Sequence, residues 1–317
     1  MTNPFLPEGR LLHTPENNAA CATLADLRRA METGMILEGR ASLCTTGHDL
    51  VVEVGPFTGI ILRPDTAIGI SEGTTRDIAI LSRVGKPICF TVTSIEGNEC
   101  SPVIYLSRKT AQMKALAWCT SLPPGTVIPA TVTHLERFGA FVDVGCGVPS
   151  MIGIEKLSVS LIPHPDRRFA VGQEIYAVIL SSDRARCRVV LSHRELLGTW
   201  LENAGKFAQG MTVRGVVRGI KDYGVFIELT PNLSGLAEPR SDLREGEWVS
   251  VYLKAILPDS MKIKLLVIDK LPACPLPAFD YFITSGYLEH WCYAPAGCRK
   301  AGTETYFVTP FDEAAPP

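Results

Sequence analysis

The sequence RFGAFVDV, residues 137–144, is the most informative stretch of this 317-residue chain because it recurs as DYGVFIEL at residues 222–229. The first copy matches the second without a gap from residue 125 to residue 153. Later segments match at a shorter spacing, so the second copy lacks about 11 residues in one loop, around residues 158–168 of the first. A recurrence of this length indicates tandem copies of one small domain.

A weaker copy lies upstream of these two. Its VVEVG at residues 51–55 resembles FVDVG at residues 141–145, and its GKPI at residues 85–88 resembles GQEI at residues 172–175. The segments we therefore expect are an N-terminal segment with a helix at 1–33, a degenerate repeat at 34–109, a repeat at 122–193, a helical linker at 194–206, a repeat at 207–270 and an aromatic-rich extension at 271–317.

Each repeat has the pattern of short β-strands. Apolar and polar residues alternate over residues 213–217, 226–229 and 249–253, and Gly and Pro separate such runs. Five short strands in about 65 to 80 residues predict a small closed barrel, which leaves no sheet edge exposed. Helices are expected between the barrels: one from Pro15, with Thr14 as its N-cap, to Gly34, and others at residues 109–119 and 194–208.

Composition limits the classes of function. The net charge of −2 argues against a protein that grips duplex DNA by bulk charge, but it permits single-strand binding through stacking on aromatic rings. The ten cysteines include no Cys-x-x-Cys pair, the N-terminus has no pattern of a secretory signal and no apolar run reaches membrane-spanning length. We expect a reduced, cytoplasmic chain without a metal; for His290, Cys292 and Cys298, packing is favoured over a metal site.

These motifs resemble the S1 RNA-binding domain family, whose members adopt the OB fold. The resemblance covers residues 34–270 and is strong in the second repeat, good in the third and weak in the first. It implies an all-β chain of tandem five-stranded OB-fold barrels of the S1 type, joined by short helices. Three copies with a degenerate first one, and the linker LSHRELLGTW at residues 191–200, are similar to the short, Gram-positive type of the bacterial 30S ribosomal S1 protein family.

The resemblance implies RNA contacts at Phe138 and Phe141, with Tyr223 and Phe226 in the same places of the third repeat. We expect Gly139 to provide a turn that projects rings three residues apart onto one face, where they can stack on unpaired bases. The alternative is core packing, which is usual for a lone aromatic residue on a barrel strand. The recurrence of the spaced pair favours RNA contact.

The resemblance also places Asp183 and Arg188 beside the aromatic face. Arg188 can bind phosphate or stack under a base, and Asp183 can accept hydrogen bonds from a base or a 2′-hydroxyl; the alternative is an ordinary ion pair. In the third repeat Lys262 replaces the arginine, and Leu257 occupies the aspartate position. His134 is expected to be structural.

Several positions depart from the family pattern. A histidine common in the family is replaced by Gly153 in the second repeat and by Glu238 in the third, where its charge would repel phosphate. In the first repeat, the residues at the aromatic, histidine and arginine positions are His48, Val51, Leu62 and Val103. We therefore expect the first repeat to dock on protein rather than to bind RNA.

The leading hypothesis is a single-stranded RNA-binding protein, associated with the ribosome and acting in mRNA binding during translation. The small ribosomal subunit is its expected partner, through the first repeat; no cofactor, membrane or small-molecule substrate is expected.

The alternatives are a regulatory RNA-binding or transcription-elongation factor away from ribosomes, a protein-docking module, and a ribonuclease that carries these barrels as an accessory. No segment is long enough for a catalytic domain, so we expect no enzyme. The extension is expected to pack on the third barrel as a hairpin or a short extension, with a partner surface as the alternative.

Overall fold

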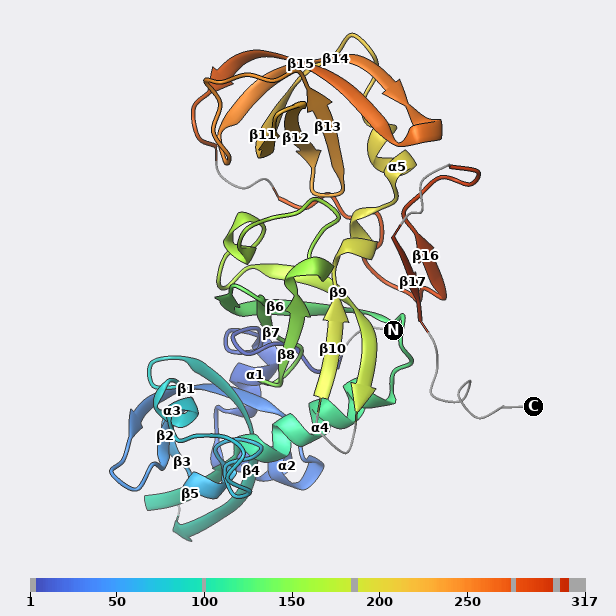
Figure 1. Ribbon diagram of the computed structural model, residues 1–317. Helices are drawn as coiled ribbons and strands as arrows, with labels where there is room; N and C mark the ends of the chain where they lie inside the picture. The colour runs from blue at the N-terminus through green and yellow to red at the C-terminus, as the bar shows by residue number, and fades with distance from the viewer. Residues whose placement is uncertain (1–3, 99–100, 184–187, 275–277, 299–302, 308–317) are drawn as a thin grey trace, which may run out of the picture.

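Three closed barrels follow one another along the molecule, with the first and third at opposite ends (Figure 1). The computed structural model describes residues 4–98, 101–183, 188–274, 278–298 and 303–307. Each barrel has five strands, and its third strand runs parallel to its fifth while the other pairs are antiparallel. The predicted all-β fold of tandem OB-type barrels joined by short helices is confirmed.

The strands of each barrel correspond to the short alternating runs of the sequence. The first barrel consists of β1 (Leu37–Cys44), β2 (Leu50–Val54), β3 (Phe57–Ile61), β4 (Pro87–Asn98) and β5 (Ser101–Ser107). The second consists of β6 (Val127–Glu136), β7 (Gly139–Asp143), β8 (Pro149–Gly153), β9 (Glu174–Asp183) and β10 (Arg188–Ser192). The third consists of β11 (Thr212–Lys221), β12 (Gly224–Thr230), β13 (Leu233–Ala237), β14 (Trp248–Leu257) and β15 (Lys262–Leu271).

The N-terminal helix begins and ends where the sequence predicted, but it is two helices. Thr14 caps the first by accepting a hydrogen bond from the backbone of Asn17, and Gly34 ends the second with a φ of 62°. Thr23 is the N-cap of the second helix, so the chain bends between the two helices.

The helices are α1 (Pro15–Ala20), α2 (Leu24–Thr33), α3 (Ile78–Leu81), α4 (Arg108–Ser121) and α5 (Trp200–Ala204). Short 3₁₀ turns are η1 (Arg63–Asp65), η2 (Ile154–Lys156), η3 (Pro165–Arg167), η4 (Arg194–Leu197) and η5 (Pro258–Ser260).

The linker expected as one helix over residues 194–208 is instead η4 followed by α5. Gly198 separates them with a φ of 82°, and a Cβ at this position would lie 2.5 Å from the ring of Phe282. Thr199 then begins α5 with a capping box formed with Glu202. A positive φ at the glycine and a fresh N-cap after it therefore end one helical segment and start another.

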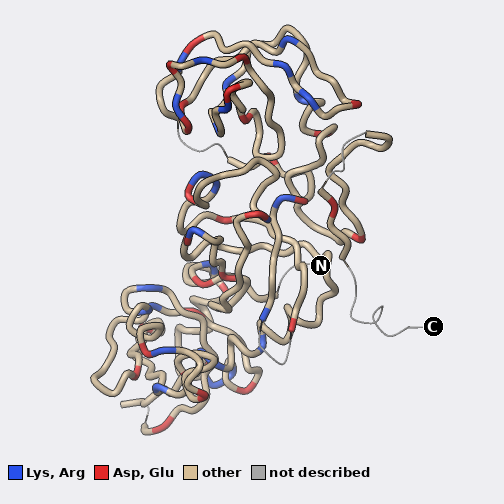
Figure 2. Tube along the Cα trace, viewed as in Figure 1, with Lys and Arg blue, Asp and Glu red and all other residues tan. Residues whose placement is uncertain are grey.

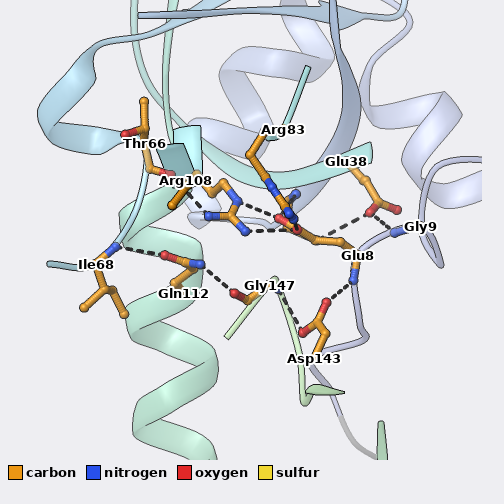
Figure 3. A network of polar contacts seen from close by, with 12 residues as sticks. Glu8, Gly9, Glu38, Thr66, Ile68, Arg83, Arg108, Gln112, Asp143 and Gly147 are labelled. Atoms are coloured by element: carbon orange, nitrogen blue, oxygen red, sulfur yellow. Dashed lines mark hydrogen bonds and ion pairs between the residues drawn. The ribbon is translucent and has the colours of Figure 1, made fainter. Parts of the chain in front are cut away.

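A buried polar network joins the first barrel to the second (Figure 3). The Glu8 carboxylate accepts hydrogen bonds from Arg108 of α4 at 2.6 and 2.9 Å, while the Glu8 backbone donates to Asp143 of β7 at 2.7 Å. Gln112 of α4 accepts from the Ile68 backbone at 2.9 Å and donates to a carbonyl of the second barrel, that of Gly147, at 2.8 Å. Burial, and then the charge of Glu8, raise the pKa of Asp143 to about 7.

The loop at residues 158–168, which the third repeat lacks, fastens the second barrel to the third. Arg168 at its end donates to Ser158 at 2.9 Å and to Glu228 of β12 at 2.7 Å. The Ser160 backbone donates to the Pro231 carbonyl at 3.1 Å. The insertion therefore provides the clamp between the two barrels that carry the aromatic pairs.

The C-terminal extension forms the expected hairpin, in which β16 (His290–Cys292) pairs with β17 (Glu304–Tyr306). The contacts of the extension extend beyond the third barrel. The backbone of Val127, at the start of β6, donates to the Gly286 carbonyl at 3.0 Å, and that of Trp200 in the linker donates to the Tyr293 carbonyl at 3.0 Å. The extension thus packs along the second barrel and the linker as well, which the sequence did not predict.

Candidate nucleic-acid interface

The predicted aromatic pair of the second barrel lies together on its outer surface. Phe138 precedes β7 and is 55% exposed, and Phe141 on β7 is half-buried. Their ring centroids are 5.9 Å apart and their planes are nearly perpendicular, at 87°. Gly139 between them does not have a positive φ; a Cβ there would instead lie 2.3 Å from the Ile152 carbonyl oxygen. The glycine is therefore needed for the close approach of β8, rather than for the unusual turn that we expected.

The third barrel repeats this geometry. Tyr223 is 67% exposed, Phe226 on β12 is half-buried, and their centroids are 6.1 Å apart with planes at 88°. The matching glycine, Gly224, again faces a neighbouring strand, because a Cβ there would lie 2.6 Å from the Ala237 carbonyl oxygen. Two separate sequences therefore place two rings edge to face on the same part of the barrel.

His134 extends the aromatic surface of the second barrel. It pairs with Phe141 across β6 and β7, its ring centroid is 6.3 Å from that of Phe141, and its Nε2 lies 2.8 Å from a Glu136 carboxylate oxygen. Its side chain is exposed, so His134, which we expected to be structural, lies on the outer face beside Phe141. A β-bulge between Val132 and His134 shifts the register, and this shift hid the pairing from sequence inspection.

Asp183 and Arg188 face each other across β9 and β10. Arg188 is exposed, and it lies on the same outward face as Val190. The strand register puts Val190 level with Met151, and Met151 level with Phe141. Arg188 therefore lies two residues from the level of Phe141, in the direction away from Phe138. The structure thus brings Phe138, Phe141 and His134 together, whereas Arg188 lies further along the barrel surface, two residues from their level.

In the third barrel, the strand register places a lysine that we did not predict on the level of Phe226. Lys262 pairs with Leu257 at the start of β15, whereas Lys264 is level with Leu236, which pairs with Phe226. Lys264 is exposed and was missed in the sequence, because only the register of β13 with β15 reveals it.

Two further positions distinguish the third barrel from the second. Gly219 faces Phe226 in the place where His134 faces Phe141. Glu238 does not present a free charge, because Lys254 donates a hydrogen bond to it at 2.8 Å. That hydrogen bond also lowers the pKa of Glu238.

The first barrel has no aromatic pair at the corresponding place. Its equivalent row is apolar and runs across four strands, through Leu43, Val51, Ile60 and Tyr105. Leu43 is 55% exposed. His48 has a φ of 65° and lies 3.9 Å from an Asp77 carboxylate oxygen. The residues at the family's histidine and arginine positions, Leu62 and Val103, are exposed.

The part of the chain that the structure describes contains no group of three or more His, Cys, Asp and Glu side chains arranged to hold a metal ion. Cys292 lies on β16, whereas the Cys298 thiol donates to the Asp259 carbonyl at 3.4 Å. Nor does any helix within the described ranges have the length and apolar character needed to cross a membrane.

Comparisons with known proteins identify the family of the chain. A family model described as S1 RNA binding domain matches residues 121–194, which include the whole second barrel. The small ribosomal subunit protein bS1 of Staphylococcus epidermidis is 30% identical over 280 residues, which cover 83% of this chain and 69% of that protein. Its counterpart in Staphylococcus aureus is 29% identical over 281 residues, with the same coverage of both chains.

Among solved structures, a multidomain protein with nucleic acid binding domains from Streptococcus pneumoniae is 13% identical. The match covers 74% of this chain and 73% of that one, with a TM-score of 0.26. GSP13 from Bacillus subtilis matches 23% of this chain and 56% of its own at 25% identity, with a TM-score of 0.22. These superpositions are too poor to add to the barrel topology described above. Sequence identity along most of both chains, together with the S1 match on the second barrel, shows that the chain belongs to the bS1 family of small ribosomal subunit proteins.

Proposed function

We propose that this protein binds single-stranded RNA on the outer faces of its second and third barrels and holds mRNA at the small ribosomal subunit during translation. The observation that carries the proposal is the repeated aromatic pair. In both barrels the first ring is more than half exposed, and both pairs have the same perpendicular arrangement. Rings kept at the surface in this way offer faces on which unpaired bases stack.

Energetics favour the use of both barrels. Stacking contributes about 1–3 kcal/mol per base, so one pair supplies at most roughly 6 kcal/mol, which corresponds to a dissociation constant of tens of micromolar or weaker. A second site held nearby acts at an effective concentration of about millimolar. The clamp between Arg168 and Glu228 holds the second barrel next to the third. Tandem binding therefore supplies the affinity that one barrel lacks.

The first barrel has the surface expected of the ribosome-docking part. Its row of Leu43, Val51, Ile60 and Tyr105 lacks stacking pairs and basic side chains, which suits contact with protein better than contact with RNA. The named relatives are small ribosomal subunit proteins, and that subunit is the partner we propose. The role is binding without catalysis, and a cytoplasmic location follows from it.

The RNA-binding proposal is tested by fluorescence anisotropy with a labelled single-stranded RNA of about 20 nucleotides, long enough for two OB barrels. We expect micromolar binding by the wild type and a loss of about tenfold or more in the double variant Phe138→Ala, Phe141→Ala. Tyr306→Ala is the matched control, because Tyr306 is 66% exposed but lies on the C-terminal hairpin. Equal binding by a folded double variant would show that the rings are not the platform.

Co-sedimentation with the small subunit separates this role from that of a regulatory factor away from ribosomes. We expect the wild type to sediment with the subunit. Leu43→Glu places a charge in the apolar row at an exposed position, and it should weaken co-sedimentation while leaving RNA affinity unchanged. A wild type that binds RNA but stays in the supernatant would favour the regulatory alternative.

A further inference from the structure

A basic cleft of about 280 Å³ lies where the second barrel meets the third. Both barrels contribute arginines to it: Arg167 and Arg168 from the end of the 158–168 loop, and Arg214 and Arg218 from β11. Figure 2 shows Lys and Arg segments on both barrels beside this junction. Trp248 adds a half-buried ring to the lining.

Positive charge in the cleft exceeds negative charge. Glu228 is the single acidic residue among the described residues that line it, and it accepts hydrogen bonds from two guanidinium groups. Arg168 donates to it at 2.7 Å, and Arg218 donates at 2.9 and 3.1 Å. Both arginine side chains and the carboxylate are largely buried. Buried charges are normally paired, so one positive charge of this triad lacks a counterpart.

The excess positive charge of the cleft is permanent. A guanidinium keeps its proton under all ordinary conditions, so the site cannot become neutral by titration. Arg167 and Arg214 are exposed at the rim; Arg167 lies 3.6 Å from the Asp166 carboxylate, and Arg214 adds a further positive charge. An anion from outside, which can accept several guanidinium hydrogen bonds at once, would complete the set; phosphate has this geometry.

The cleft lies between the two aromatic pairs along the chain. Glu228 is two residues after Phe226 on β12, and both side chains point to the outer face of the strand. On the other side, the Phe138 carbonyl accepts a hydrogen bond from Ile154, the first residue of the η2 turn that leads into the 158–168 loop. Short stretches of backbone therefore connect each aromatic pair to residues that line or adjoin the cleft.

We propose that this cleft binds the phosphodiester backbone of single-stranded RNA and joins the two aromatic faces into one continuous path. The inference rests on the proposed RNA-binding function and specifies where the strand crosses between barrels.

The test compares two pairs of arginine substitutions of equal charge. Arg167→Ala with Arg214→Ala removes the rim of the cleft, whereas Arg28→Ala with Arg29→Ala removes two exposed arginines from α2 on the first barrel. Each loss of a phosphate contact should reduce the slope of log affinity against log salt by about 0.7. For an RNA of about 20 nucleotides we expect the rim variant to lose about 1.4 units of slope, if both arginines contact phosphate, and at least roughly fivefold in affinity at about 0.05 M salt.

RNA length provides a second readout. An RNA of about 6 nucleotides occupies one barrel, so the rim substitutions should change its affinity by less than about twofold. The double lysine variant, Arg167→Lys with Arg214→Lys, should restore most of the salt slope because it keeps the charge. Thermal melting of every variant checks folding; the substituted side chains are exposed.

The possible failures are distinguishable. If the wild type binds neither RNA, the proposed function itself is wrong. If the wild type binds and the Phe138, Phe141 variant does not, but the rim variant has the same salt slope as the α2 variant, RNA binding stands and the phosphate site is wrong. A rim variant that weakens the short and the long RNA equally would place the phosphate contact within one barrel instead of between the two.

Discussion

The two junctions between barrels are both built from buried charges, but their charges are unbalanced in opposite directions. Between the second and third barrels, two arginines share the carboxylate of Glu228. Between the first and second barrels, the acidic side chains outnumber the basic ones; the members are Glu8, Glu38, Asp143, Arg83 and Arg108. A buried arginine that binds a carboxylate thus occurs at both junctions, but with opposite excess of charge.

The difference shows which junction is complete in itself. An excess of carboxylates can be neutralised by a proton, and burial does raise the pKa of both Asp143 and Glu38. An excess of guanidinium groups cannot be neutralised in this way. We therefore interpret the first junction as a self-contained joint and the second as a joint that an external anion completes. The aromatic faces lie on either side of the second junction, where such an anion would be RNA.

The largest effect should come from removing the shared carboxylate. Glu228→Gln leaves two buried guanidinium groups without a counter-charge, and loss of one partner in a buried ion pair typically costs about 3–5 kcal/mol. Glu238→Gln on the same barrel is the control, because its ion pair with Lys254 is exposed and screened by water, so its loss should change stability little. Urea denaturation measures both variants. Equal, small losses would show that the second junction is not held by this triad.

The proton at the first junction should be visible in the pH dependence of stability. Folded Asp143 keeps its proton up to a pKa of about 7, whereas an unfolded aspartate releases it near pH 4. Between these values the folded state binds more protons, so the contribution of Asp143 to stability falls as pH rises from about 4 to about 7 and is constant above that. The Asp143→Asn variant lacks this contribution, because an amide side chain does not titrate in this range.

In urea denaturation of the wild type and of Asp143→Asn at several pH values, the wild type should therefore lose stability relative to the variant as pH rises through this window. Raising the pH further should change the difference no more. A difference that stays constant from about pH 4 to about pH 7 would mean that Asp143 is ionised throughout, and that the acidic excess is balanced in another way.

Local patterns in the sequence were sufficient to predict the barrels and the aromatic pairs. Alternation fixes strands, and the spacing of Phe138 and Phe141 around one glycine fixes two rings on one surface. Contacts between distant segments were not predictable in this way. The loop at residues 158–168 was noticed only as an extra length, although it supplies Arg168 to Glu228.

The strand register accounts for the other differences between the predicted site and the observed one. Bulges and parallel pairing decide that His134 lies beside Phe141, and that Lys264 rather than Lys262 is level with Phe226. A single sequence shows which residues form a strand, but a shift of one residue moves a side chain to the opposite face. The site was therefore predictable where it depends on neighbours in sequence and hidden where it depends on pairing.

The smallest effect on stability should come from Arg218→Met, and it is the sharpest test of the contrast between the junctions. Arg168 and Glu228 would remain as a one-to-one pair, and Met fills a similar volume, so the free energy of unfolding should change by less than about 1 kcal/mol. The affinity for RNA of about 20 nucleotides should nevertheless fall severalfold, because the surplus positive charge is gone. Urea denaturation and anisotropy on the same preparation measure both quantities. If Arg218→Met destabilises the protein as much as Glu228→Gln does, Arg218 belongs to the clamp itself, and the second junction is as self-contained as the first.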